Sequence, residues 1–307
     1  MPALSSYTKL LSTAQAEKLH TVLSEKGFRF DEKPHCLFAG AGDKVNVAVY
    51  AKGPKVVVQG KNAEDFVKFT LEPEVLGVAE LGYEEVLHPE MFSPHIGVDE
   101  SGKGDFFGPL VVAGVYGDAS VARALQAMGI MDSKRIGSDA RIKVLAMQMR
   151  TVPGLVQDVI VIGPERYNAL YLKFGNLNKL LAWGHAKVIE NLLERVTDCP
   201  RALSDQFANP KVLQSALQAR GRKIILEQRT KAESDPIVAA ASIFAREGFV
   251  RWLNETGVKL GIELPKGASP AVKAAAAAIK ARHGPAMLEN AAKMHFRTAR
   301  ELGDENT

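Results

Sequence analysis

The chain has 307 residues, of which 46% are hydrophobic and 24% are charged. This composition is typical of a globular protein with enough core for one large or two ordinary domains. No apolar run approaches the roughly 20 residues that span a bilayer, and the first residues lack the basic and apolar regions of a secretion signal. Cys36 and Cys199 are the only cysteines and lie far apart, so we expect a reduced, cytoplasmic protein that enters no membrane.

Charge is distributed in blocks along the chain. Residues 1–70 hold ten lysines and arginines against seven acids, residues 71–90 hold six glutamates and no base, and residues 91–307 hold 29 bases against 22 acids. Two basic segments on either side of an acidic one suggest two domains that could each touch a polyanion. A solvated surface of mixed charge is the alternative that charge alone leaves open.

The first 75 residues predict a small α+β domain. Apolar side chains recur near a 3.6-residue period over residues 7–26, which predicts a helix. Short runs of β character follow between residues 28 and 59, and the last two are joined by Ala51-Lys52-Gly53-Pro54, which is a hairpin signal. A second helix is predicted over residues 63–71.

Lysines accompany the predicted strands of this domain. Lys44, Lys52 and Lys55 fall on or beside them, where they could face a phosphate backbone and add affinity that weakens with salt. The next segment, residues 76–93, is acidic and carries prolines, so we predict a linker there. Residues 94–307 would then form a separate domain.

Strands and helices alternate along this second domain, which predicts an α/β fold on a mixed central sheet. After a first strand that ends at the two acids described next, strands are predicted over residues 110–116, 155–162, 202–207 and 223–227. Helices are predicted over residues 121–128, 138–150, 178–195, 236–254 and 271–281, with a further one opened by Asn209-Pro210.

The most informative stretch lies at the start of this domain, in residues 96–113. An apolar run ends in Asp99 and Glu100, a glycine-rich turn with Lys103 follows, and a second apolar run begins at Leu110. We interpret this stretch as strand, tight loop and strand. Adjacent carboxylates repel each other, and a divalent cation between them would offset that repulsion.

Two other glycine-rich motifs fit this stretch poorly. A phosphate-cradling P-loop needs serine or threonine after its lysine, whereas Gly104 stands there, and the two acids would repel a triphosphate. A dinucleotide-binding fingerprint needs a third glycine where Phe107 stands. An acidic turn with a purely structural role remains the alternative on this stretch alone.

The run Asp99-Glu100-Ser101-Gly102-Lys103-Gly104-Asp105, followed by Phe107-Gly108-Pro109-Leu110, resembles the signature of type 2 ribonucleases H. Lys103 favours ribonuclease HIII, because ribonuclease HII usually has arginine between these glycines. The N-terminal block favours it too, since ribonuclease HIII carries an N-terminal module that resembles the TATA-binding protein and holds substrate, whereas ribonuclease HII lacks it. The resemblance covers about residues 95–300 with specific motifs and is weaker over residues 1–75.

This resemblance implies a fold and an activity. The fold would be a ribonuclease H-like mixed sheet with flanking helices, preceded by the TATA-binding-protein-like domain. The activity would be hydrolysis of the RNA strand of RNA–DNA hybrids by a monomeric endonuclease that uses two ions of Mg²⁺ or Mn²⁺ and leaves 5′-phosphate and 3′-hydroxyl ends. Incision at single ribonucleotides in duplex DNA, as by ribonuclease HII, and non-catalytic binding of hybrids are the alternatives.

Four acids lie near the ends of predicted elements and could converge: Asp99, Glu100, Asp205 and Glu233. Neighbouring residues of a strand point to opposite faces, so we expect the backbone to turn between Asp99 and Glu100, which the glycines after them would permit. Carboxylates suit Mg²⁺, which prefers hard oxygen ligands. The resemblance assigns all four as catalytic and metal-binding residues, with Asp99 bridging the ions, and Asp235 is the nearby alternative to Glu233.

Substrate recognition is predicted for other residues. We expect Ser101, Gly102, Lys103 and Gly104 to bring backbone amides close to the RNA strand, whose 2′-hydroxyls distinguish it from DNA. Asp132-Ser133-Lys134 matches another motif of the family, in which Ser133 and Lys134 would contact the nucleic-acid backbone. An ordinary capped turn is the alternative there.

Histidines contribute little to the predicted site. Residues 264–268 and 293–298 also resemble segments of ribonuclease HIII, and His295 in the second of them could touch substrate, although a packed or surface histidine is the preferred interpretation. His185 and His283 show no metal-ligand spacing and are predicted to be structural.

Overall fold

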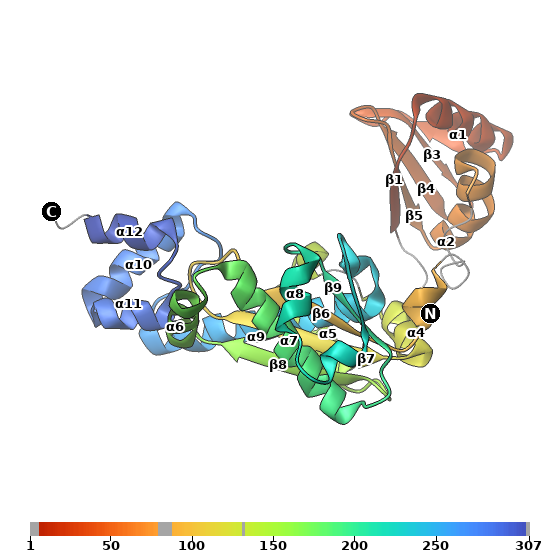
Figure 1. The fold of residues 1–307 in the computed structure, drawn as a ribbon. Coiled ribbons are helices and arrows are strands. Elements are labelled where there is room, and N and C mark those ends of the chain that lie inside the picture. Colours follow the sequence, from red (N-terminus) through yellow and green to blue (C-terminus); the bar gives the residue numbers. More distant parts are fainter. Residues whose placement is uncertain (1–5, 79–87, 131–132, 305–307) are drawn as a thin grey trace. The chain divides into compact units, whose positions relative to one another are not determined.

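The computed structural model describes residues 6–78, 88–130 and 133–304, and the chain separates into two compact units, residues 1–90 and 91–307 (Figure 1). Residues 79–87, at the centre of the predicted linker, lie outside the described residues. Within the described part of the chain, no helix is long and apolar enough to cross a membrane.

The first unit is a five-stranded antiparallel sheet with helices on one face, in the order β1-β5-β4-β3-β2. Its strands are β1 (Ser6–Leu10), β2 (Arg29–Asp31), β3 (Cys36–Gly42), β4 (Val45–Tyr50) and β5 (Lys55–Gly60). Its helices are α1 (Thr13–Glu25) and α2 (Ala63–Phe66), and α2 continues as wider π-helical turns over Val67–Leu76. Alternating valines of β4 and β5 point inward and pack against Leu19 and Leu23 of α1, which leaves the other face of the sheet without a helix.

The helix predicted over residues 7–26 is wrong in its first residues. Ser6–Leu10 form β1, which pairs antiparallel with β5, and α1 begins only after Ser12. The Ser12 hydroxyl accepts a hydrogen bond from the Gln15 amide, and the Gln15 side chain accepts one from the Ser12 amide, which is a capping box. The helical signal around Leu10 is local, whereas the exposed edge of β5 is a non-local partner that only the folded chain provides.

The second unit is built on a five-stranded mixed sheet in the order β10-β9-β6-β7-β8. Strand β6 runs parallel to β9, and β9 runs parallel to β10, whereas the pairs β6–β7 and β7–β8 are antiparallel. The strands are β6 (His95–Ser101), β7 (Leu110–Gly117), β8 (Val156–Ile162), β9 (Arg201–Asp205) and β10 (Ile225–Arg229). The predicted α/β domain with a mixed central sheet is therefore confirmed.

Nine α-helices of this unit lie within the described residues. They are α4 (Ala119–Ala127), α5 (Asp139–Met149), α6 (Pro164–Phe174), α7 (Leu177–Arg195), α8 (Pro210–Ala216), α9 (Pro236–Leu260), α10 (Pro270–His283), α11 (Pro285–Ala291) and α12 (Arg297–Asp304). The sequence patterns miss α6, α11 and α12. Only Pro164 and Tyr167 of α6 are buried, so its apolar stripe is too narrow to give a clear helical period.

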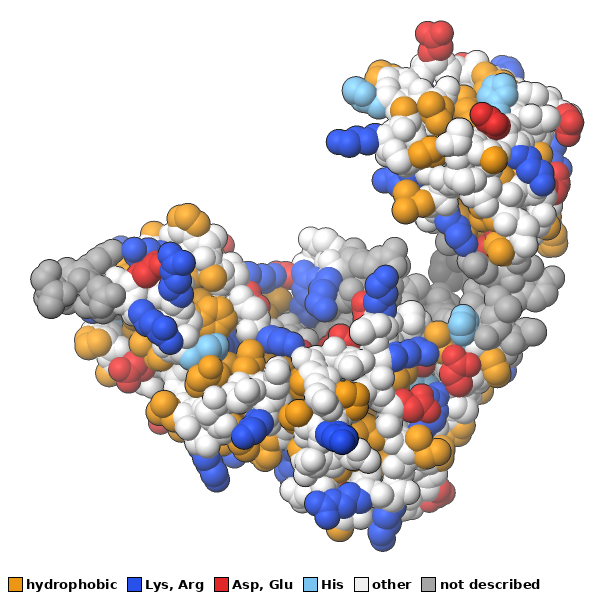
Figure 2. Space-filling model, turned by 45° about the horizontal axis from the view of Figure 1, so that its top comes forward, with side chains coloured by type: hydrophobic (Ala, Val, Ile, Leu, Met, Phe, Trp, Pro, Cys, Tyr) orange, Lys and Arg blue, Asp and Glu red, His pale blue; other side chains and the backbone are white. Residues whose placement is uncertain are grey.

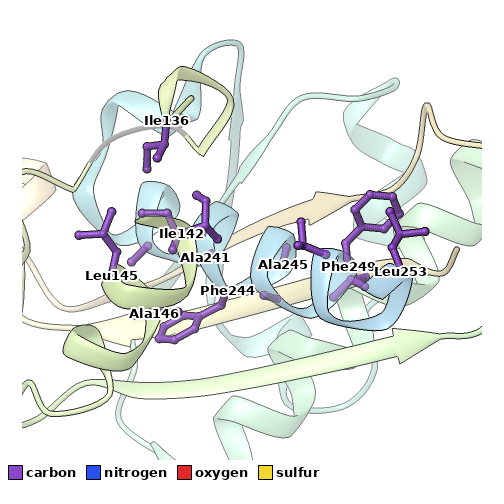
Figure 3. Packing of buried hydrophobic residues seen from close by; sticks show 14 of the residues in the cluster. Ile136, Ile142, Leu145, Ala146, Ala241, Phe244, Ala245, Phe249 and Leu253 are labelled. Carbon is purple, nitrogen blue, oxygen red and sulfur yellow. The ribbon is translucent and has the colours of Figure 1, made fainter. Parts of the chain in front are cut away.

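Helices cover both faces of the mixed sheet. Helix α9 packs across β6 and β7 on one face, and α7 packs across β7 and β8 on the other. Helix α9 lies so close that a Cβ on Gly97 of β6 would come within 2.5 Å of the Val238 nitrogen. Ala241 and Phe244 of α9 pack toward α5, with Ala241 beside Ile142 and Phe244 beside Ala146 (Figure 3). The ends of β6 and β9 are thus held between packed layers.

Candidate active site

Asp99 and Asp205 lie side by side at the ends of two parallel strands. The register of β6 and β9 pairs Val98 with Ser204, so the next residues are Asp99 and Asp205, on strands about 4.8 Å apart. Asp99 pairs across the sheet with Ala113, whose side chain belongs to the core under α9, so both aspartates belong to the α9 face. Asp99 is 7% exposed, and the structure therefore brings two of the predicted acids together at a buried strand end.

Glu100 belongs to the opposite face of the sheet. Strand β6 continues straight through Ser101, and Glu100 pairs with Val112 of β7. The turn expected between Asp99 and Glu100 is therefore wrong, because β7 supplies ladder partners up to Ser101 and the chain turns only at Gly102. The two residues are still in contact at the strand end, because the Glu100 amide donates a hydrogen bond to Asp99 Oδ1 at 2.8 Å.

His185 of α7 holds the Glu100 carboxylate. Its Nε2 lies 3.0 Å from Glu100 Oε2, and its Nδ1 lies 3.0 Å from Ser204 Oγ. Ser204 in turn donates to the backbone carbonyl of Asp205. The imidazole is fully buried and meets the Phe207 ring edge-on at 4.9 Å between centroids. His185 thereby connects an acid of β6 to the end of β9.

This contact revises the prediction that His185 has only a structural role. The two partners are 85 residues apart in sequence, so no local spacing signals the contact. The one available sign is a histidine among the leucines and alanines that form the buried face of α7. A polar side chain on such a face needs a buried partner, and here the partner is a predicted site residue.

The two neighbouring acids differ in their electrostatics. Burial, together with the charges of Glu100 and Asp205, raises the pKa of Asp99 well above its usual range. Burial also acts to raise the pKa of Glu100, but the hydrogen bond and charge of His185, with Lys103 and Lys134, outweigh it and lower that pKa. Lys103 Nζ lies 3.6 Å from Glu100 Oε1. The negative charge at Asp99 is therefore the less compensated of the two.

Glu233 lies in a short 3₁₀ turn, Ala232–Ser234, directly before α9. The Ala232 amide donates to Asp205 Oδ1 at 3.3 Å, so this turn is docked on the end of β9. The residue next to Ala232 is Glu233, which is partly exposed. Its backbone therefore lies beside Asp205, on the α9 side of the sheet.

Asp235, the alternative to Glu233, is occupied by structural contacts. It is fully buried and caps α9, where its Oδ1 accepts hydrogen bonds from the amides of Ile237 and Val238. The same oxygen lies 3.1 Å from Nε2 of the buried His95. These contacts favour Glu233 over Asp235 as the fourth acid.

The glycine-rich loop leaves β6 after the half-buried Ser101. Gly102 has φ of +88°, and a Cβ there would lie 2.2 Å from the Pro109 carbonyl oxygen, so the turn requires glycine. Gly104 is different, because an added Cβ would meet nothing within 4 Å. Lys103 Nζ lies 5.8 Å from the centre of the Phe207 ring. The loop is thus tightly built at its base and open at Gly104.

The second predicted recognition motif begins at Asp132, which lies outside the described residues. Ser133 is buried, its amide donates to Ser242 Oγ at 3.0 Å, and its carbonyl accepts from the Arg246 guanidinium. Lys134 is exposed, and its charge acts to lower the pKa of both Asp99 and Glu100. Of the two described residues of this motif, Lys134 is the one whose side chain faces solvent near the acids.

Comparison with known proteins assigns the family. The ribonuclease HII family model matches residues 96–299. A ribonuclease HIII of Chlamydia trachomatis serovar L2 is 44% identical over 305 residues, which are 98% of this chain and 99% of the relative. The chain belongs to the ribonuclease HIII group of this family. A ribonuclease HIII of Chlamydia abortus is 43% identical over 284 residues, 92% of either chain.

Solved structures of the group agree over both units. The crystal structure of Bst-RNase HIII in complex with Mn²⁺ matches with a TM-score of 0.68 at 29% identity and covers 98% of this chain and 99% of that one. The predicted fold, a ribonuclease H-like sheet preceded by a small TATA-binding-protein-like domain, is therefore confirmed.

The lysines predicted to bind substrate in the first unit do not form one cluster. Lys44 lies in the turn between β3 and β4, and Lys52 lies in the turn between β4 and β5. These turns are at opposite ends of β4, a span of about 20 Å for a six-residue strand. Lys55 begins β5, where it pairs with the exposed Leu10 and Tyr50 on the face that carries no helix.

Two histidines have packing roles, in agreement with the preferred interpretation. His283 Nε2 lies 2.9 Å from the Leu260 carbonyl oxygen. His295 stacks on the Tyr171 ring at 4.3 Å between centroids and also contacts Tyr167 and Phe296.

The donor chemistry of the site suits a hard divalent cation. Among the described residues, no three acidic, histidine or cysteine side chains lie close enough to hold an ion by themselves. Mg²⁺ does not require such a cage, because proteins bind it through one or two carboxylates, with waters and substrate phosphates completing the shell. Asp99, whose pKa is raised by burial and by Glu100 and Asp205, is the carboxylate that a cation would stabilise most. The residues present therefore fit the ion.

Proposed function

We propose that the protein is an endonuclease that hydrolyses the RNA strand of RNA–DNA hybrids, with Asp99, Glu100, Asp205 and Glu233 as its catalytic and metal-binding acids. The observation that carries this proposal is the position of Asp99 and Asp205, each one residue beyond the last pair of the parallel strands, Val98 and Ser204. They lie beside a glycine-rich loop, in a chain of the ribonuclease HIII group. All of these residues come from one chain, so a monomer suffices.

The cofactor in this proposal is Mg²⁺ or Mn²⁺, and the relative Bst-RNase HIII was crystallised with Mn²⁺. Asp99, Asp205 and Glu233 would hold it from the α9 side of the sheet, and Glu100 from the α7 side. Bound metal would supply Lewis acidity that lowers the pKa of an attacking water and stabilises the leaving 3′ oxygen, and the expected products carry 5′-phosphate and 3′-hydroxyl ends. Proton uptake by Asp99 competes with this binding, because its pKa is raised.

The protein groups around the acids have their own tasks. His185 fixes the orientation of Glu100, and Lys103 and Lys134 balance negative charge where a phosphate backbone would lie. The space at Gly104 allows a ribose to approach the backbone of the loop, and the 2′-hydroxyl marks the RNA strand. Lysine and arginine side chains are spread over the visible face of the larger unit (Figure 2), which suits sequence-independent contacts.

The first unit is proposed to hold the substrate, with residues 1–75 as its domain, 76–93 as the linker and 94–307 as the catalytic domain. Its helix-free sheet face carries Asn46, Gln59 and Lys55, all exposed. Such a face offers hydrogen bonds and little charge, and the lysines of the turns add charge at its ends. Cys36 and Cys199 are both free thiols, which suits a cytoplasmic location.

The test compares a uniform RNA–DNA hybrid with a DNA duplex that contains one ribonucleotide, each with Mg²⁺, Mn²⁺ or chelator. We expect cleavage of the hybrid with either ion, little incision of the second duplex, and no cleavage in chelator. End analysis of the products should give 5′-phosphates. Efficient incision at the single ribonucleotide would replace this assignment with a ribonuclease HII-like one, and binding without cleavage would replace it with a hybrid-binding role.

A further inference from the structure

Lys293 is a fully buried lysine near the glycine-rich loop that the chemistry above does not use. Its side chain has no exposed surface. Its Nζ donates hydrogen bonds to two backbone carbonyls, that of Asp105 at 2.8 Å and that of Phe107 at 3.3 Å. The rings of Tyr167 and Phe249 lie near the amine, with centroids 5.7 and 5.9 Å from Nζ.

This position is costly for a lysine. Within the described residues no carboxylate oxygen lies in ion-pair range of Nζ, and burial lowers the pKa of Lys293 to about 7 although the charge of Asp105 acts to raise it. A methionine has nearly the same length and would fill the site without a buried amine, but it would leave the carbonyls of Asp105 and Phe107 without this donor. The cost of burying the amine therefore opposes the gain from its hydrogen bonds, and the two hydrogen bonds are the specific reason for a lysine here. An uncharged amine retains two N–H donors, one for each carbonyl.

Both carbonyls belong to the segment through which the chain leaves the glycine-rich loop. The Lys293 amide also donates to the carbonyl of Phe106, and the Phe106 amide donates to the carbonyl of Gly267. The Asp105 carboxylate accepts from the Gly267 amide at 2.6 Å. At its other end, the glycine-rich loop begins directly after β6. The exit segment, residues 105–107, is thus held by hydrogen bonds from two C-terminal segments, one at Gly267 and one at Lys293. Lys293 is bonded to this segment through both its amide and its side chain.

We propose that Lys293 is a positioning residue that fixes residues 105–107 and thereby sets where Lys103 and Gly104 meet the RNA strand. The inference rests on the proposed role of the loop in reading that strand. It gives a part in substrate affinity to a buried side chain that lies more than 180 residues from the loop in sequence. Because the Lys293 side chain bonds carbonyls of the loop exit and none of the four acids, its loss should affect binding of the hybrid more than the chemical step.

The test is Lys293→Met in the full chain, with Lys280→Met as the matched control. Lys280 also donates to a backbone carbonyl, that of Leu302 at 2.8 Å, but it lies on α10 and does not contact the loop. For Lys293→Met we expect a melting temperature near that of wild type, because relief of the buried amine offsets the lost hydrogen bonds. We also expect faster hydrogen exchange of the amides of residues 102–108 and a KM for a uniform hybrid raised about tenfold, the effect of losing one or two ordinary hydrogen bonds. The kcat should stay within about threefold of wild type, and Lys280→Met should change neither exchange in the loop nor KM.

Three results would overturn the inference. One is Lys293→Met with wild-type KM and wild-type exchange in residues 102–108. Another is a fall in melting temperature without any change in KM, which would assign Lys293 to stability alone. If Lys293→Met does not fold, Lys293→Leu, which also lacks a donor, takes its place, and a KM equal to that of wild type with unchanged exchange would overturn the inference in the same way. A wild-type chain that does not cut hybrids refutes the proposed function, while the exchange measurement still decides whether Lys293 holds the loop.

Discussion

Replacement of His185 tests whether Glu100 must be held in one orientation. The imidazole bonds Glu100 Oε2 and Ser204 Oγ, both at 3.0 Å, inside a fully buried site. A hydrogen bond to a charged group contributes about 1.5–3 kcal/mol. If that energy is lost from the transition state, kcat falls by about 10- to 100-fold, because each 1.4 kcal/mol corresponds to one factor of ten.

Two isosteric replacements separate the two ring nitrogens. Glutamine places its amide nitrogen near the position of Nε2 and can still donate to Glu100, whereas asparagine places its amide near Nδ1 and reaches only toward Ser204. We therefore expect His185→Gln to retain most of kcat and His185→Asn to lose it, with similar melting temperatures for the two. The assay is single-turnover cleavage of a uniform hybrid at saturating Mg²⁺, with hybrid affinity and thermal unfolding measured on the same samples.

Equal activity of the two variants would refute this reasoning, because the contact with Glu100 would then make no difference to catalysis. A loss of activity that only follows a loss of melting temperature would refute it as well, since His185 would then act through stability.

Three further comparisons follow from the site. Glu233→Gln should abolish turnover at an unchanged melting temperature, whereas Asp235→Ala should lower the free energy of unfolding by about 1–2 kcal/mol through the lost helix cap and keep most turnover; the reverse pattern would exchange the two acids. Gly102→Ala should destabilise the fold by about 1–3 kcal/mol, as expected for a left-handed residue that also clashes, and Gly104→Ala should leave unfolding unchanged while raising KM for the hybrid; equal effects on unfolding would contradict this. The pKa of Asp99 is raised by burial and by Glu100, so metal-free protein should lose stability as pH rises through that pKa, and Asp99→Asn should remove this loss. Thermal unfolding in chelator and in Mg²⁺ measures this, and Mg²⁺ should stabilise wild type but not the variant.

Much of the second unit could be predicted because its signals are local. Alternating apolar runs and capping residues such as Ser138, which accepts from the Arg141 amide at the start of α5, give strands and helices directly. The site acids at the end of β6 were recognisable because two adjacent carboxylates before glycines are unfavourable without a partner. Asp205 and Glu233 could be added only through resemblance to a family, since nothing near them in sequence distinguishes a ligand from a turn residue.

Apart from the missed helices, the errors concern contacts between distant parts of the chain. Strand β1 depends on the edge of β5, and the straight path of β6 through Glu100 depends on its ladder with β7. The bond of His185 to Glu100 depends on how α7 crosses the sheet, which no residue spacing encodes. Lys44 and Lys52 lie far apart because they occupy the turns at the two ends of β4. A count of basic residues along the sequence does not show this separation.

The most direct test of the account is the single-turnover rate of hybrid cleavage by Asp205→Asn at saturating Mg²⁺, with hybrid affinity measured in parallel. If Asp205 and Asp99 share an ion between β9 and β6, the rate should fall at least about 1,000-fold, equivalent to about 4 kcal/mol of transition-state stabilisation, while affinity for the hybrid stays near that of wild type. A rate within tenfold of wild type would contradict the account, because the side-by-side aspartates would then have no common task.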